Sequence, residues 1–131
     1  MNINDVSEVK ETNDKLSQIF EEQTELMHKY KVIEKMPEWP LNLHSRDHQK
    51  ILKDFIYRVI EELCEAGHVL KNKPWTQRDL ETDVDHYKEE LADALHFFVE
   101  LCILSGIDAK ELYSLYYRKK KVNQFRQETK Y

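Results

Sequence analysis

Apolar residues recur every three or four positions over most of this chain, which is the spacing of one face of an α-helix. The pattern predicts four helices, over residues 6–30, 47–70, 83–104 and 108–127. Pro37 and Pro40 break the pattern between the first two, and Pro74 lies in a predicted loop at 71–82. We therefore predict an all-α fold, a bundle of four to five helices in one domain spanning residues 1–131.

Two local signals mark the connection between the last two predicted helices. Gly106 suits the left-handed backbone position that often ends a helix. Asp108, followed three residues later by Glu111, is typical of an N-cap with its capping-box partner. The fourth helix is therefore predicted to begin directly after Asp108.

Composition and charge limit the possible partners. Only 2 Gly and 3 Pro occur among 131 residues, which favours helices. The formal net charge of −5 argues against a general binder of nucleic acid or of anionic membranes. The polar N-terminal segment lacks the apolar core of a signal peptide, and no apolar run approaches the roughly 20 residues of a membrane span. We expect a cytoplasmic protein with neither nucleic-acid nor membrane partners.

The two cysteines, Cys64 and Cys102, each lie inside an apolar helical pattern. A structural zinc site needs four ligands, and two distant cysteines do not make a disulfide framework. We predict that both are buried, reduced thiols.

Two pairs of carboxylates interrupt the most apolar stretches of the chain. Glu62 and Glu65 lie three residues apart in the second predicted helix, as do Glu90 and Asp93 in the third. This spacing puts both members of a pair on one helix face, with Cβ atoms roughly 5–6 Å apart. A single such residue usually pairs with Lys or Arg, but four on two adjacent apolar helices repel one another unless a cation neutralises them. An all-oxygen ligand set predicts Mg²⁺, with Mn²⁺ also possible.

A di-iron centre is the alternative metal site. Glu65 and His68 form a Glu-x-x-His pair, and Asp93 and His96 have the same spacing. Di-iron carboxylate bundles use two Glu-x-x-His pairs and one Glu from each of two further helices. The fourth predicted helix has Glu only near its ends, so this alternative lacks a ligand.

Cations concentrate in the last predicted helix, over residues 116–127. Such a run is often only a solvated helix end, where Lys complements the helix dipole. Here Lys119, Asn123 and Arg126 recur at helical spacing and share one face. Two cations and an amide on one face suit phosphate groups. Beside a metal-loaded carboxylate cluster, this face predicts a nucleoside polyphosphate as the ligand.

These residues carry a resemblance to a known family. Glu61-Glu62-x-x-Glu65 followed by Glu90-x-x-Asp93 resembles the EExxE…ExxD signature of the all-α nucleoside triphosphate pyrophosphatases, the MazG-like and dimeric dUTPase superfamily. The segment 90–97 and the ending Asn123-x-Phe125-Arg126-Gln127, with Tyr131, resemble the dimeric dUTPases in particular. The resemblance covers most of the chain from residue 23 onward.

The resemblance implies a set of site residues and an assembly. The implied Mg²⁺ ligands are Glu62, Glu65, Glu90 and Asp93. The implied substrate-binding residues are Gln23, Lys73, Trp75, His96, Phe97, Lys119, Asn123 and Arg126, with Gln23 near the base and the last three near the phosphates and sugar. The resemblance also implies a homodimer or a higher symmetric homo-oligomer, with a site built partly from a neighbouring subunit.

The leading hypothesis is a Mg²⁺-dependent dUTP diphosphatase that forms dUMP and pyrophosphate by attack of water on the α-phosphorus. Glu62 is the expected acceptor of the water's proton, with Glu65 as the second candidate. Leu26-Met27 stands where the family has an Asn near the base, so uracil and cytosine both stay open. Two competing hypotheses are a dCTP or broader nucleoside triphosphate pyrophosphatase and a non-catalytic helical nucleotide-binding module.

Overall fold

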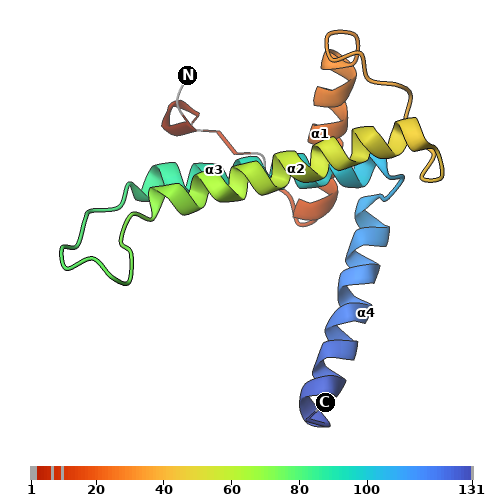
Figure 1. Cartoon of the computed structure of the whole chain (residues 1–131). Helices are drawn as coiled ribbons and strands as arrows, with labels where there is room; N and C mark the ends of the chain where they lie inside the picture. Colours follow the sequence, from red (N-terminus) through yellow and green to blue (C-terminus); the bar gives the residue numbers. More distant parts are fainter. Residues whose placement is uncertain (1–2, 7, 10, 131) are drawn as a thin grey trace.

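The computed structural model describes residues 3–6, 8–9 and 11–130, and over these the chain is helical without any strand (Figure 1). The elements are a short 3₁₀ helix η1 (Ile3–Asp5) and four α-helices, α1 (Lys15–Tyr30), α2 (Arg46–Val69), α3 (Val84–Leu104) and α4 (Ala109–Glu128). The prediction of an all-α fold is confirmed. Tyr131, part of the family-like ending, lies outside the described residues.

Each α-helix begins where a side-chain oxygen accepts a backbone N–H of the first turn, which satisfies one of the donors that a helix start leaves open. Asp14 accepts from Ser17 at 3.1 Å, and Asp108 accepts from Glu111 at 2.8 Å. The second contact confirms the predicted N-cap of α4. The predicted start of α1 at residue 6 is wrong, because the segment before Asp14 is polar and the apolar face begins only at Leu16.

The long helices α2 and α3 lie side by side and run in opposite directions, joined by the loop at residues 70–83 (Figure 1). Helix α1 packs against α3. Helix α4 leaves the end of α3 that is opposite this loop and extends away from the pair. Residues 115–130 of this arm are all exposed.

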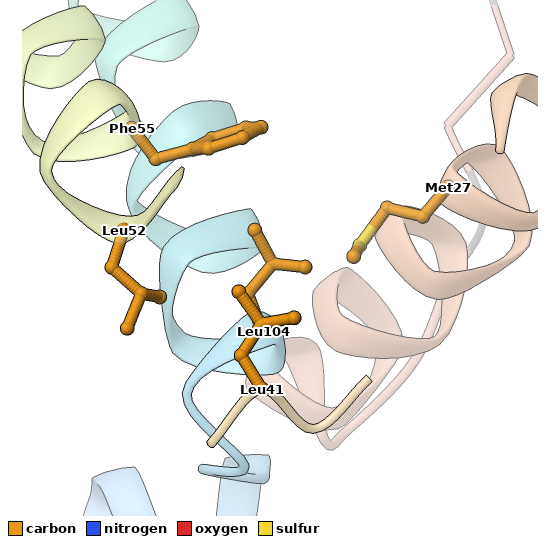
Figure 2. Close-up of a cluster of buried hydrophobic side chains, with 5 residues drawn as sticks. All are labelled: Met27, Leu41, Leu52, Phe55 and Leu104. Carbon is orange, nitrogen blue, oxygen red and sulfur yellow. The ribbon is translucent and has the colours of Figure 1, made fainter. Parts of the chain in front are cut away.

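The main core joins α1, α2, α3 and the connection between α1 and α2. Figure 2 shows its five buried side chains, Met27, Leu41, Leu52, Phe55 and Leu104. The backbone N–H of Leu41 also donates to the carbonyl of Leu104 at 2.8 Å, which holds the connection against the end of α3. A second buried cluster, Phe20, Val99, Cys102 and Ala109, packs α1 and the first turn of α4 onto α3.

Gly106 ends α3 in the predicted left-handed conformation, with a φ of 80°. The N–H groups of Gly106 and Ile107 donate to the carbonyls of Ile103 and Cys102, which is the paired pattern of a Schellman motif. A Cβ added to Gly106 would lie 3.1 Å from the Cβ of Pro40. Glycine is therefore needed here for both conformation and space.

Large apolar side chains stay exposed on both long helices. They include Ile56, Ile60 and Leu63 on α2, and Leu91, Leu95 and Phe98 on α3. Each set recurs at positions four and seven residues after its first member, so each forms a stripe along its helix. The chain therefore presents apolar faces that its own described residues leave uncovered.

One cysteine differs from the prediction. Cys102 is buried as expected, and burial raises the pKa of its thiol, but Cys64 is exposed. Cys64 lies nine residues after the buried Phe55, which in a helix turns it about half a circle away from the core-facing side. Among the described residues, none of the helices combines the length and apolarity that crossing a membrane requires.

Candidate metal site

Three of the four predicted carboxylates meet where the second half of α2 faces the first half of α3. Glu62, Glu65 and Glu90 each offer an oxygen, and these oxygens lie within 4.8 Å of one another. Glu90 is buried with 9% of its surface exposed, Glu62 is half-buried and Glu65 is exposed. The three carboxylates therefore run from the helix interface outward to solvent.

Asp93, the fourth predicted ligand, lies one helical turn after Glu90 and is half-buried. Its charge is one of those that raise the pKa of Glu62. The structure therefore brings three of the four predicted ligands together, and Asp93 is not among the three.

The cluster holds a proton where isolated carboxylates would not. Burial raises the pKa of Glu62 to about 7, and the neighbouring Glu90, Glu65 and Asp93 add to this shift. The pKa of Glu90 is lowered, first by its interaction with Glu62 and further by Glu65 and His86, against the opposing effect of burial. At neutral pH Glu90 is therefore ionised while Glu62 is poised near its midpoint.

The two oxygens of Glu90 have different surroundings. The ring Nε2 of His86 donates to Oε1 at 2.9 Å. Oε2 is buried and has no hydrogen-bond partner within the described chain. A buried carboxylate oxygen without a partner destabilises a fold, and a bound cation would supply that partner. The donor set is all oxygen, which fits Mg²⁺ or Mn²⁺.

A cavity of about 480 Å³ opens beside the cluster, between the end of α2 and the start of α3. Its walls include Glu65 and Glu90 from the cluster, with His68, Lys71 and His86. Part of the surface around the carboxylates is therefore accessible to a ligand that enters from solvent.

The structure also brings together Gln23 and His96, two of the predicted substrate-binding residues. They lie 73 positions apart, yet His96 Nδ1 is 3.0 Å from Oε1 of Gln23. The buried Gln23 lines a groove of about 400 Å³ between α1 and α3, whose other walls include the apolar Ile19, Leu26 and Leu95.

Other predicted substrate-binding residues lie elsewhere. Phe97 packs against the main core and makes an edge contact with Phe55, with ring centroids 6.4 Å apart. Lys73 and Trp75 lie in the 70–83 loop, where the Lys73 ammonium is 5.6 Å from the Trp75 ring centroid. Trp75 is 76% exposed, so its indole is available to a ligand or partner.

The basic face of α4 is far from the carboxylates within one chain. Asp93 precedes the end of α3 by eleven residues, about 17 Å along the helix axis. Helix α4 then carries Lys119, Asn123 and Arg126 outward along an arm that extends away from the α2–α3 pair (Figure 1). The single chain therefore separates the predicted phosphate-binding residues from the predicted metal ligands.

Two polar residues were missed by sequence reasoning, one at the carboxylate cluster and one in another part of α3. His86 precedes Glu90 by four residues, a spacing that would have predicted their contact. Glu100 is 9% exposed, and burial raises its pKa to about 7, with Glu34 adding to the shift and Arg58 opposing it. Glu100 shares one helical face with Phe97 and Leu104, and this pattern could have predicted its burial.

Comparisons with models of protein families, with curated proteins and with solved structures give no match to this chain. The family resemblance of the carboxylate signature and of the C-terminal segment therefore stays a prediction.

Proposed function

We propose that this chain is a Mg²⁺-dependent nucleoside triphosphate pyrophosphohydrolase whose preferred substrate is dUTP. The observation that carries the proposal is the cluster of Glu62, Glu65 and Glu90, in which one buried oxygen of Glu90 has no partner within the described chain. A divalent cation would give this oxygen a partner and neutralise the adjacent charges, and the signature of these residues resembles that of enzymes that hydrolyse nucleoside triphosphates. Lys119, Asn123 and Arg126 then supply a face suited to phosphate groups.

The reaction adds water to the α-phosphorus and breaks the bond between this phosphorus and the bridging oxygen, releasing dUMP and pyrophosphate. Bound Mg²⁺ supplies charge neutralisation and makes a water molecule more acidic. Glu62 is the proposed acceptor of the water's proton, because it is half-buried at the helix interface, where its orientation is restricted. Lys119 and Arg126 stabilise the negative charge that develops on the departing pyrophosphate.

The proposed active unit is a symmetric homodimer or a higher symmetric homo-oligomer. Two observations support this: the α4 arm is exposed over residues 115–130, and the stripes on α2 and α3 leave large apolar side chains uncovered. A second copy that covers the stripes can place its basic α4 face near the carboxylates, where opposite charges attract. Each site would then combine carboxylates from one subunit with cations from the other.

Subunit mixing tests this assembly. Glu62→Ala and Lys119→Ala remove opposite halves of the proposed shared site, so each variant alone should lose most activity. After the two are unfolded and refolded together, mixed dimers contain one intact site, and activity should partly return. A mixture as inactive as its components would exclude sharing of the site between subunits.

The pair of Gln23 and His96 supports a nucleobase as the occupant of the groove between α1 and α3. The buried Gln23 amide and the His96 ring together carry donors and acceptors, the groups that bind the edge of a pyrimidine. The comparison of dUTP with dCTP distinguishes uracil from cytosine at this position.

A matched pair of variants tests the metal site. Glu62→Ala should abolish Mg²⁺-dependent hydrolysis of dUTP, whereas Glu61→Ala removes the adjacent exposed carboxylate and should retain it. Equal hydrolysis by both variants contradicts the proposed site. Hydrolysis of dUTP, dCTP, dTTP and UTP is compared side by side, and equal turnover of all four contradicts the preference for dUTP.

The same assays separate the competing hypotheses. Absence of hydrolysis for every nucleotide, with thermal stabilisation by nucleotides intact, indicates a non-catalytic nucleotide-binding module. A coloured protein containing transition metal after aerobic purification indicates a di-iron centre.

A further inference from the structure

A histidine outside the predicted ligand set contacts the most buried carboxylate of the candidate metal site. The ring of His86 lies on the first turn of α3 and its Nε2 is 2.9 Å from Oε1 of Glu90. An ionised carboxylate only accepts hydrogen bonds, so Nε2 is the protonated nitrogen in this contact. The two residues are four positions apart, so the helix itself aligns them.

The two oxygens of Glu90 differ in their hydrogen bonding. Oε1 is occupied by His86, whereas Oε2 is buried and has no partner within the described part of the chain. Glu90 is the most buried member of the three-carboxylate cluster, so its rotation is already restricted by packing. The hydrogen bond from His86 also fixes the orientation of the carboxylate group.

The position of His86 is itself anchored. The side chain of Asp83, the N-cap of α3, accepts the backbone N–H of His86 at 3.1 Å. A short series of contacts therefore runs from the end of the 70–83 loop through the first turn of α3 to Glu90. Both His86 and Glu90 also line the cavity of about 480 Å³ beside the cluster.

We propose that His86 is a positioning residue that holds Glu90 by Oε1 and so presents Oε2 as the metal-binding oxygen. The inference rests on the proposed metal site and concerns the affinity of that site. Hydrogen-bond partners of this kind reduce the reorganisation that a ligand undergoes when a cation binds, and their loss typically weakens metal affinity roughly 10- to 100-fold.

The test is direct titration of Mn²⁺ into the full chain, followed by calorimetry or by the electron paramagnetic resonance signal of free Mn²⁺. His86→Gln keeps an N–H donor near the place of Nε2, whereas His86→Met has similar length and no donor. We expect His86→Met to weaken Mn²⁺ binding roughly 10-fold or more and His86→Gln to restore most of the affinity. His44→Ala, which removes an exposed imidazole on the connection between α1 and α2, is the control and should bind like the wild type.

Folding is checked separately, by thermal unfolding of each variant without metal. The His86 side chain is 53% exposed, so its replacement opens no core cavity. Equal Mn²⁺ affinity of the Gln and Met variants overturns the positioning role, even if both differ from the wild type. If the wild type binds no Mn²⁺, the proposed metal site is contradicted. This outcome differs from failure of the positioning role, in which the wild type binds Mn²⁺ and the Gln and Met variants bind it equally.

Discussion

Binding of Mg²⁺ to the carboxylate cluster should release a proton in an amount that depends strongly on pH. The perturbation is the titration of metal-free protein with Mg²⁺. A cation binds the ionised form of Glu62, whereas the metal-free cluster holds a proton there with a pKa of about 7. Binding therefore displaces whatever fraction of this proton is present at the chosen pH.

The expected magnitude follows from that pKa. At about pH 6 roughly 0.9 proton should leave per occupied cluster, and at about pH 8 only about 0.1, since Glu62 is then already ionised. Glu90, whose pKa is lowered, contributes little at either pH. Affinity for Mg²⁺ should accordingly rise from about pH 6 to about pH 8.

The assay is calorimetric titration at each pH in two buffers with different ionisation enthalpies. The change of the apparent binding enthalpy with buffer enthalpy gives the number of protons released. Glu100→Gln is the control, because Glu100 also has a pKa raised to about 7 but belongs to a different part of α3. This variant should leave the release unchanged. Equal release at the two pH values, or a release abolished by Glu100→Gln, would refute the reasoning.

Two further predictions concern stability in the absence of metal. The folded state keeps the Glu100 proton that the unfolded chain gives up above a pKa of about 4.5, so the wild type should lose stability as pH rises from about 4.5 through about 7. Glu100→Gln should reduce this loss by at most about 3 kcal/mol in the free energy of unfolding, measured in urea at about pH 5 and at about pH 8. A pH dependence equal to that of the wild type would contradict the burial of the carboxyl. Gly106→Ala should destabilise by about 1 kcal/mol or more, because the φ of 80° disfavours any side chain and its Cβ would meet Pro40 at 3.1 Å. An unchanged thermal midpoint for Gly106→Ala would show that the end of α3 adapts.

The features that sequence reasoning predicted correctly are mostly local. Asp108 and Gly106 act through neighbours within a few residues, so their roles as cap and left-handed stop can be read from the chain alone. The meeting of Glu62 with Glu90 was also predictable. Each pair interrupts a strongly apolar helical face, and two such faces in a small all-helical chain pack together.

The features that were missed depend on how helices are placed in three dimensions. The exposure of Cys64 follows from which side of α2 meets α3, and an apolar pattern that surrounds much of the helix does not reveal this. The separation of Lys119 from the carboxylates follows from the direction in which α4 leaves α3, which is set at the Gly106 turn. The start of α1 was placed too early because helical spacing was extended into a polar segment that buries no apolar face.

The exposed arm of α4 makes hydrogen exchange a reporter of assembly. Residues 115–130 are all exposed, so in an isolated chain this helix depends on its own backbone hydrogen bonds. Helical segments of about 12–15 residues are only marginally stable in water, and such amides exchange rapidly. A second copy packed on the arm would slow their exchange. The protection of the α4 amides should therefore rise with protein concentration, and it would measure association without any substrate or metal present.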